Sequence, residues 1–145
     1  MAGAAATQVA LTVPLLHRFR GIGLVLVAMV FLVLRSLGIP HILESSDSAS
    51  VVAYALAGAG AVLVAIALLV FKPRVPDRQP GQSVEAYWKT PEVAAMALRV
   101  WFLLEGGALM AAMGYFMTGQ PGAAAAMVAA VAVFWLFGPN VFAKG

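Results

Sequence analysis

The chain has 145 residues, of which 63% are hydrophobic and 10% charged, and its mean hydropathy is +0.95. This composition lies well outside the range of a soluble domain. The absence of cysteine excludes disulfides, thiolate metal ligands and cysteine nucleophiles. The net charge of +3 is the usual result of topology in a membrane protein, so we expect no nucleic-acid partner.

The apolar residues are gathered in four blocks rather than spread along the chain. A helix that crosses a bilayer needs ~20 residues at a rise of 1.5 Å each. In chain order, we predict transmembrane helices over 21–43, 51–71, 93–117 and 123–142, with a polar loop over 72–92. The blocks lack the alternation of barrel strands. We therefore expect an all-α integral membrane protein in which residues 1–145 form one up-down four-helix domain.

The basic residues predict how this domain lies in the membrane. Most of them fall at one end of an up-down bundle: His17, Arg18 and Arg20 before the first helix, Lys72, Arg74, Arg78 and Lys89 in the long loop, and Lys144 near the C-terminus. The loop at the other end carries Glu44 and Asp47, with Arg35 beside it. By the positive-inside rule both termini and the loop 72–92 are cytoplasmic. The expected location is a cell membrane, most simply a bacterial inner membrane.

Small side chains predict where the helices touch. The second helix carries alanine at every fourth position, namely Ala53, Ala57, Ala61 and Ala65, and the third carries Gly107 and Ala111 at the same spacing. In lipid, small residues let two backbones approach closely and so indicate a contact face. We predict that these residues pack within the chain. An interface with another subunit, or a rotor ring, is the alternative.

Glu105 is the residue that most needs an explanation, because it lies near the middle of the third predicted helix. A charge at that depth costs at least ~2.5–3.5 kcal/mol unless it has a partner. Counted from the start of each predicted helix, Glu105 and Arg35 lie at similar depths of ~18 and ~22 Å. We therefore predict an ion pair between them. Arg99 lies closer to the cytoplasmic edge and on another face. A protonated Glu105, an ion-carrying Glu105, and a contact with a headgroup or cofactor are the alternatives.

The two histidines, His17 and His41, lie at opposite ends of the first predicted helix. They cannot bind one metal ion together within a single copy, and neither lies at the depth of a haem held between two helices. A bound lipid, or a pigment or haem at the interface, is the cofactor that the sequence leaves open, and none is indicated. We expect no metal site and no catalytic residue, since no serine or threonine in a predicted span lies near a base.

The second and third helices faintly resemble the proteolipid (c-type) subunit of rotary ATPases. The residues that carry the resemblance are the small-residue helix from Ala53 to Ala61, the loop triplet Arg78-Gln79-Pro80, and the carboxylate of Glu105. The resemblance implies that Glu105 binds the transported ion. The sequence departs from that family in its longer loop, its two additional helices, its alanines in place of glycines, and Gly106-Gly107 after the carboxylate.

Two functions follow as hypotheses from these features. The first is a non-catalytic accessory or scaffold subunit of a larger membrane complex, with the lipid bilayer and other membrane-protein subunits as partners. The second is ion or proton translocation through Glu105. A scaffold is expected to hold Glu105 paired inside the bundle, whereas a carrier needs it on an open, hydrated or intersubunit surface.

Overall fold

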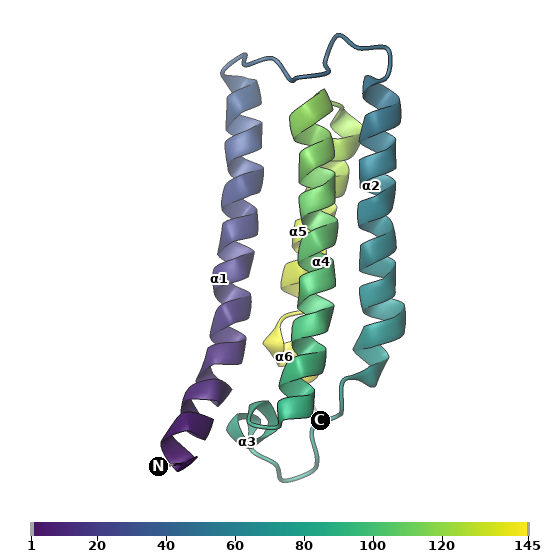
Figure 1. The fold of residues 1–145 in the computed structure, drawn as a ribbon. Coiled ribbons are helices and arrows are strands. Elements are labelled where there is room, and N and C mark those ends of the chain that lie inside the picture. Colours follow the sequence, from purple (N-terminus) through teal and green to yellow (C-terminus); the bar gives the residue numbers. More distant parts are fainter. Residues whose placement is uncertain (1, 145) are drawn as a thin grey trace.

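The computed structural model describes the backbone of residues 2–144 and the side chains of residues 13–144. Its helices are α1 (Ala2–Ser36), α2 (Ala49–Ile66), α3 (Val84–Trp88), α4 (Pro91–Thr118), α5 (Pro121–Leu136) and α6 (Pro139–Phe142). At its end, α2 continues into a π-helix, η1 (Ala67–Phe71), and a 3₁₀ turn, η2 (Lys72–Arg74). In Figure 1 the long helices alternate in direction, and both chain ends lie at the same end of the bundle as α3. The predicted all-helical fold is confirmed over the described residues.

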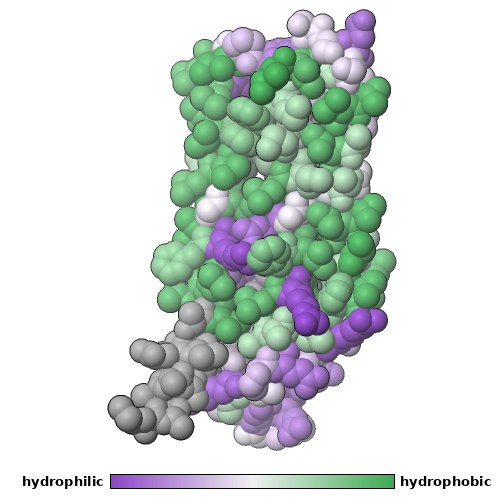
Figure 2. Space-filling model, in the orientation of Figure 1, coloured by the Kyte–Doolittle hydropathy of each residue, from purple (hydrophilic) through white to green (hydrophobic). Residues whose placement is uncertain are grey.

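Three segments are long and apolar enough to cross a membrane: Val13–Ser36, Ala49–Arg74 and Pro91–Thr118. The fourth long helix, α5, has 16 residues, which is about 24 Å against a hydrocarbon thickness of ~30 Å. Figure 2 shows a surface that is hydrophobic over most of its height and hydrophilic mainly at its ends. These features indicate a membrane protein. They give three candidate spans and one shorter apolar helix.

Two of the four predicted helices have wrong boundaries. The predicted 21–43 begins too late, because α1 already contains His17, Arg18 and Arg20, and it ends too late, because α1 stops at Ser36 before Gly38, whose φ is +74°. The predicted 123–142 is divided at Gly138, after which Pro139 begins α6. Proline cannot continue a preceding helix but is well suited to the first position of a new one.

The bundle is built around α4. Within the candidate spans, 44% of the most apolar window of α4 is buried, against 17% in α1 and 11% in α2. The closest approach is between Gly60 of α2 and Gly107 of α4: a Cβ added to Gly60 would lie 2.6 Å from the Gly107 carbonyl oxygen, and one added to Gly107 would lie 2.8 Å from the Gly60 carbonyl oxygen. Only glycine allows two backbones to come so near.

The predicted alanine ridge follows this contact only at its start. Ala53 is buried and Ala57 half-buried, whereas Ala61 and Ala65 are exposed, so the prediction is wrong for the last two. Four residues advance a helix by about 400°, so a four-residue repeat drifts ~40° per step away from any fixed face. The buried residues of α2 and η1 are Ala49, Ala53, Gly60 and Ala67, and the last three of them are seven residues apart. On α4, Gly107 and Ala111 are both buried.

Gly60 and Gly58 offer a matched test of the glycine contact. Gly60→Ala is expected to destabilise the folded protein by about 1–3 kcal/mol, because the added methyl group would meet the backbone of α4. Gly58→Ala is expected to be neutral or to stabilise by up to ~1 kcal/mol, because a Cβ there meets nothing within 4 Å and alanine favours helix. Thermal unfolding in detergent measures both. Equal effects at the two positions would contradict the contact.

Candidate functional site

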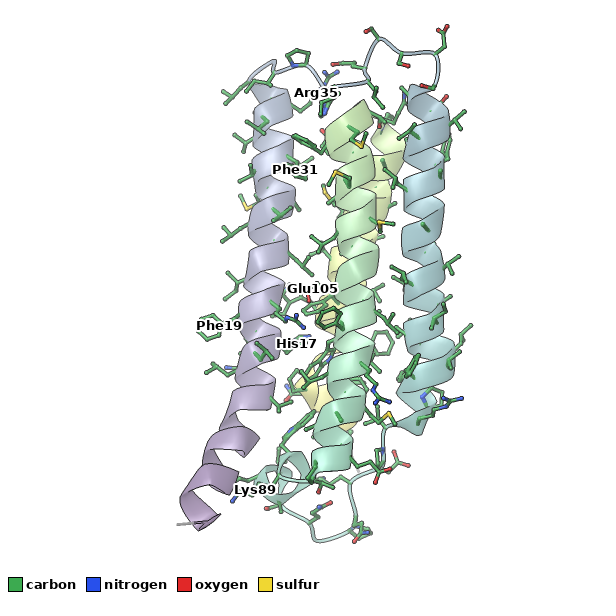
Figure 3. All side chains as sticks on the ribbon, viewed as in Figure 1. His17, Phe19, Phe31, Arg35, Lys89 and Glu105 are labelled. Atoms are coloured by element: carbon green, nitrogen blue, oxygen red, sulfur yellow. The ribbon has the colours of Figure 1, made fainter. Side chains whose placement is uncertain are left out.

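Glu105, the carboxylate near the middle of the candidate span Pro91–Thr118, is paired within the chain. Arg20 of α1 and Glu105 of α4 form a salt bridge of 3.2 Å between Nε and Oε2, and their side chains are 25% and 21% exposed. The guanidinium also lies over the Phe102 ring, 4.6 Å from its centroid. Figure 3 shows the Glu105 side chain between α1 and α4, and Figure 2 shows a hydrophilic patch at the same height. The salt bridge thus joins α1 to α4 by a polar contact between mainly apolar helix faces.

The predicted pair between Arg35 and Glu105 is wrong. Arg35 forms its salt bridge with Glu44, in the loop that follows α1. The depth of Arg35 was counted from Arg20 as if the helix began there, but α1 begins well before Arg20, and the apolar span found among the described residues already includes Val13. Arg20 therefore lies inside the span at the level of Glu105, and Arg35 lies fifteen residues, or about 22 Å, further along the helix.

The loop after α1 is held by its own polar contacts. Glu44 accepts hydrogen bonds from the backbone N–H of His41, at 3.2 Å, and from Arg35. These two contacts, the backbone one first, lower the pKa of Glu44 below its usual value. Arg35 thus stabilises the exposed loop after α1 through its salt bridge with Glu44.

The end of α5 is capped by side chains from two other helices. The last carbonyls of a helix have no partner in the helix itself. His17 Nε2 lies 3.1 Å from the Phe134 carbonyl oxygen, and Trp101 Nε1 donates to the Phe137 carbonyl oxygen at 2.7 Å. His17 and Phe134 also stack, with ring centroids 4.4 Å apart. Both capping side chains are almost completely buried. Their polar atoms thus replace the water that a short helix end would otherwise need.

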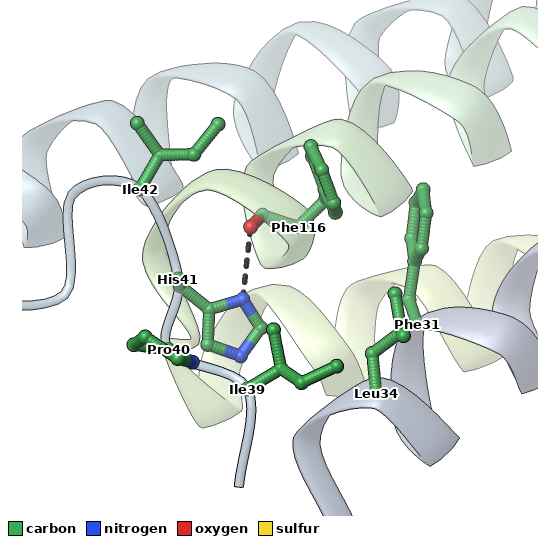
Figure 4. A pocket seen from close by; sticks show the side chains of 7 residues that line it. All are labelled: Phe31, Leu34, Ile39, Pro40, His41, Ile42 and Phe116. Carbon is green, nitrogen blue, oxygen red and sulfur yellow. Dashed lines mark hydrogen bonds between the residues drawn. The ribbon is translucent and has the colours of Figure 1, made fainter. Parts of the chain in front are cut away.

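His41 caps α4 in the same way at the other end of the bundle. Its Nδ1 lies 2.8 Å from the Phe116 carbonyl oxygen, as Figure 4 shows, and the backbone N–H of Leu43 donates to the Met117 carbonyl oxygen at 2.7 Å. The histidine faces a small cavity of about 120 Å³ with apolar walls that include Phe31, Leu34 and Ile39. The sequence marked both histidines, but as possible cofactor ligands at the interface and not as caps.

The described side chains contain no group of three or more His, Asp and Glu residues that could bind a metal ion together. No protein-family model, no curated protein and no solved structure matches this chain. The site must therefore be judged by its geometry. Arg20 and Trp101 are the functional side chains that the sequence did not single out. No local sequence pattern links Trp101 to the Phe137 carbonyl oxygen that it caps.

The Arg20–Glu105 pair predicts a specific pattern of stability changes. Glu105→Gln and Arg20→Gln are each expected to destabilise the protein by about 2–4 kcal/mol, because the remaining charge is left unpaired at membrane depth. The double variant is expected to recover much of that loss. Unfolding in detergent or bicelles measures the cycle.

Arg35→Gln is the matched control for this cycle. Its salt bridge is at an exposed loop, so its cost is expected to be within about 1 kcal/mol and to add independently to that of Glu105→Gln. Coupling of Arg35, rather than Arg20, to Glu105 would contradict the observed pairing.

The hydrogen bond that caps α5 predicts that two buried tryptophans differ in how much stability is lost when each is replaced by phenylalanine. Trp101→Phe removes the donor to the Phe137 carbonyl oxygen, whereas Trp88→Phe removes an indole N–H for which the described residues show no hydrogen bond. Both side chains are buried, at 1% and 2% exposure. We expect Trp101→Phe to destabilise by about 1–3 kcal/mol more than Trp88→Phe. A hydrogen-exchange measurement at the amides of Phe137, Gly138 and Asn140 would show whether the loss is local to the cap.

Proposed function

We propose that the chain is a non-catalytic accessory or scaffold subunit of a larger membrane complex. In this proposal α1, α2, α4 and α5 all cross or enter a cell membrane, most simply a bacterial inner membrane. The basic end of the bundle, with both termini and residues 75–83, faces the cytoplasm. The partners are the lipid bilayer and other membrane-protein subunits.

The observation that carries this proposal is that Glu105 and three polar ring side chains bind groups of their own chain. Glu105 is bound to Arg20, and His17, Trp101 and His41 lie on helix-end carbonyls. A catalytic or transporting site would need a group aimed at a substrate. These side chains are engaged with their own chain, which supports a structural role.

The surface supports an assembly role as well. Large apolar side chains stand exposed along α1 and α2, including Phe19, Leu26, Val62 and Leu69, each more than half exposed. In a bilayer such faces meet lipid or another apolar helix. The bundle has little mass outside its helices with which to bind a soluble partner, so a partner subunit would meet it through these faces.

Ion or proton translocation is the second candidate, because the salt bridge is not fully enclosed. The side chains of Arg20 and Glu105 are a fifth to a quarter exposed, so a neighbouring subunit or water could reach them from one side. For transport, Glu105 would have to exchange Arg20 for an ion during each cycle.

The decisive experiment measures both complex assembly and ion transport, for the wild type and for one double variant. Native protein is purified with a C-terminal tag, and co-purifying membrane proteins are identified by mass spectrometry, for the wild type and for Glu105→Gln/Arg20→Gln. The scaffold proposal expects the same stoichiometric partner with both proteins and no change in ion flux in reconstituted vesicles. A partner-free protein whose flux depends on Glu105 would favour the carrier.

The orientation is tested by labelling, which is simple because the chain has no cysteine of its own. Ser45→Cys and Ser83→Cys place single thiols on exposed residues at opposite ends of the bundle. An impermeant maleimide added to intact cells is expected to label position 45 and to spare position 83 until the cells are opened. The reverse pattern would invert the proposed topology.

A further inference from the structure

A large groove lies at the basic end of the bundle, between α1, α3 and the turn from α5 to α6. Its volume is about 1220 Å³, more than the ~300–1,000 Å³ of a typical small-molecule site. Apolar side chains form most of its walls, among them Leu15, Val84, Trp135, Leu136 and Val141. The shape and lining suit a long hydrocarbon chain rather than a compact polar ligand.

His17 lies in the wall of this groove and is closed off from it. The side chain is only 1% exposed, and while Nε2 lies on the Phe134 carbonyl oxygen, Nδ1 is buried and has no partner. Gly138 packs against the ring: a Cβ there would lie 3.4 Å from Cε1 and 3.9 Å from Nδ1. A ligand in the groove therefore meets apolar walls at this point, and its polar contacts must come from the rim.

At its rim the groove has a cation without a carboxylate partner among the described residues. Arg18 is exposed and lines the groove, and the ion pairs found over residues 13–144 do not include it. The nearby carboxylate of Glu85 is occupied by Lys89, at 2.8 Å. Helix side chains lean toward the helix N-terminus, which brings Arg18 toward the basic end of the bundle. An anionic group at the rim would complement it.

We propose that this groove binds one anionic phospholipid, for which phosphatidylglycerol serves as the probe. Arg18 contacts the phosphate, and an acyl chain lies along Leu15 and Leu136. Basic pockets between membrane helices are known to hold anionic headgroups. This site goes beyond a scaffold role, because it makes the folded protein bind a particular class of lipid from one leaflet of the membrane.

Native mass spectrometry tests the proposal directly. The delipidated protein is titrated with phosphatidylglycerol or with phosphatidylcholine of the same acyl chains. The wild type is expected to retain one phosphatidylglycerol in preference to phosphatidylcholine. Arg18→Gln is expected to weaken phosphatidylglycerol binding about tenfold, the loss of one charge-assisted hydrogen bond. Phosphatidylcholine, whose choline cation offsets the charge of its phosphate, is expected to lose less, so the preference for phosphatidylglycerol decreases.

Arg74→Gln is the matched control, since Arg74 is an exposed cation at the same end that does not line the groove. Its effect is expected to be less than about twofold, well below the tenfold loss of a charge-assisted bond. Leu15→Trp, which fills the groove without touching a charge, should reduce retention of both lipids. Unfolding temperatures verify that each variant is folded. Equal binding of the two lipids to the wild type, or equal effects of Arg18→Gln and Arg74→Gln, would overturn the proposal.

Discussion

A buried backbone carbonyl group must find a donor within the protein, and the last carbonyl groups of α5 lie beside the buried side chains of His17 and Trp101. The positions of the other elements follow from this constraint. His17 brings α1 to the end of α5, and Trp101 brings α4 to it. The polar atoms that appear misplaced in an apolar sequence are thus the ones that a truncated helix requires. The same rule operates at the opposite end, where the loop after α1 closes over α4.

The helices are held to α4 by two different kinds of contact. α2 approaches through glycine, backbone against backbone, and this contact depends on shape alone. α1 packs less closely and is fixed by polar contacts, the salt bridge to Glu105 and the ring of His17 among the aromatic side chains of α4 and α5. Shape contacts tolerate no added bulk, whereas polar contacts tolerate looser packing but need their partners. The two helices should therefore respond to different classes of substitution.

Composition and block length were sufficient to predict a helical membrane protein, and Glu105 was correctly identified as a residue in need of a partner. The partner itself was missed because Arg20 was treated as the boundary of a helix, a reasonable inference for a cation that turned out to be neutralised inside the span. The alanine repeat misled in a related way: sequence spacing of four looks like a face, but the helical period is 3.6. The caps could not be foreseen, since they join residues as far apart as His17 and Phe134, and no local pattern records such a meeting.

The salt bridge also has a consequence for the order in which the protein is made. Arg20 and His17 leave the ribosome 85 and 117 residues before Glu105 and Phe134. At synthesis rates of about 5–20 residues per second, α1 waits roughly 4–23 s for these partners. The polar contacts that fix α1 against α4 and α5 can therefore form only after both of those later helices have been made.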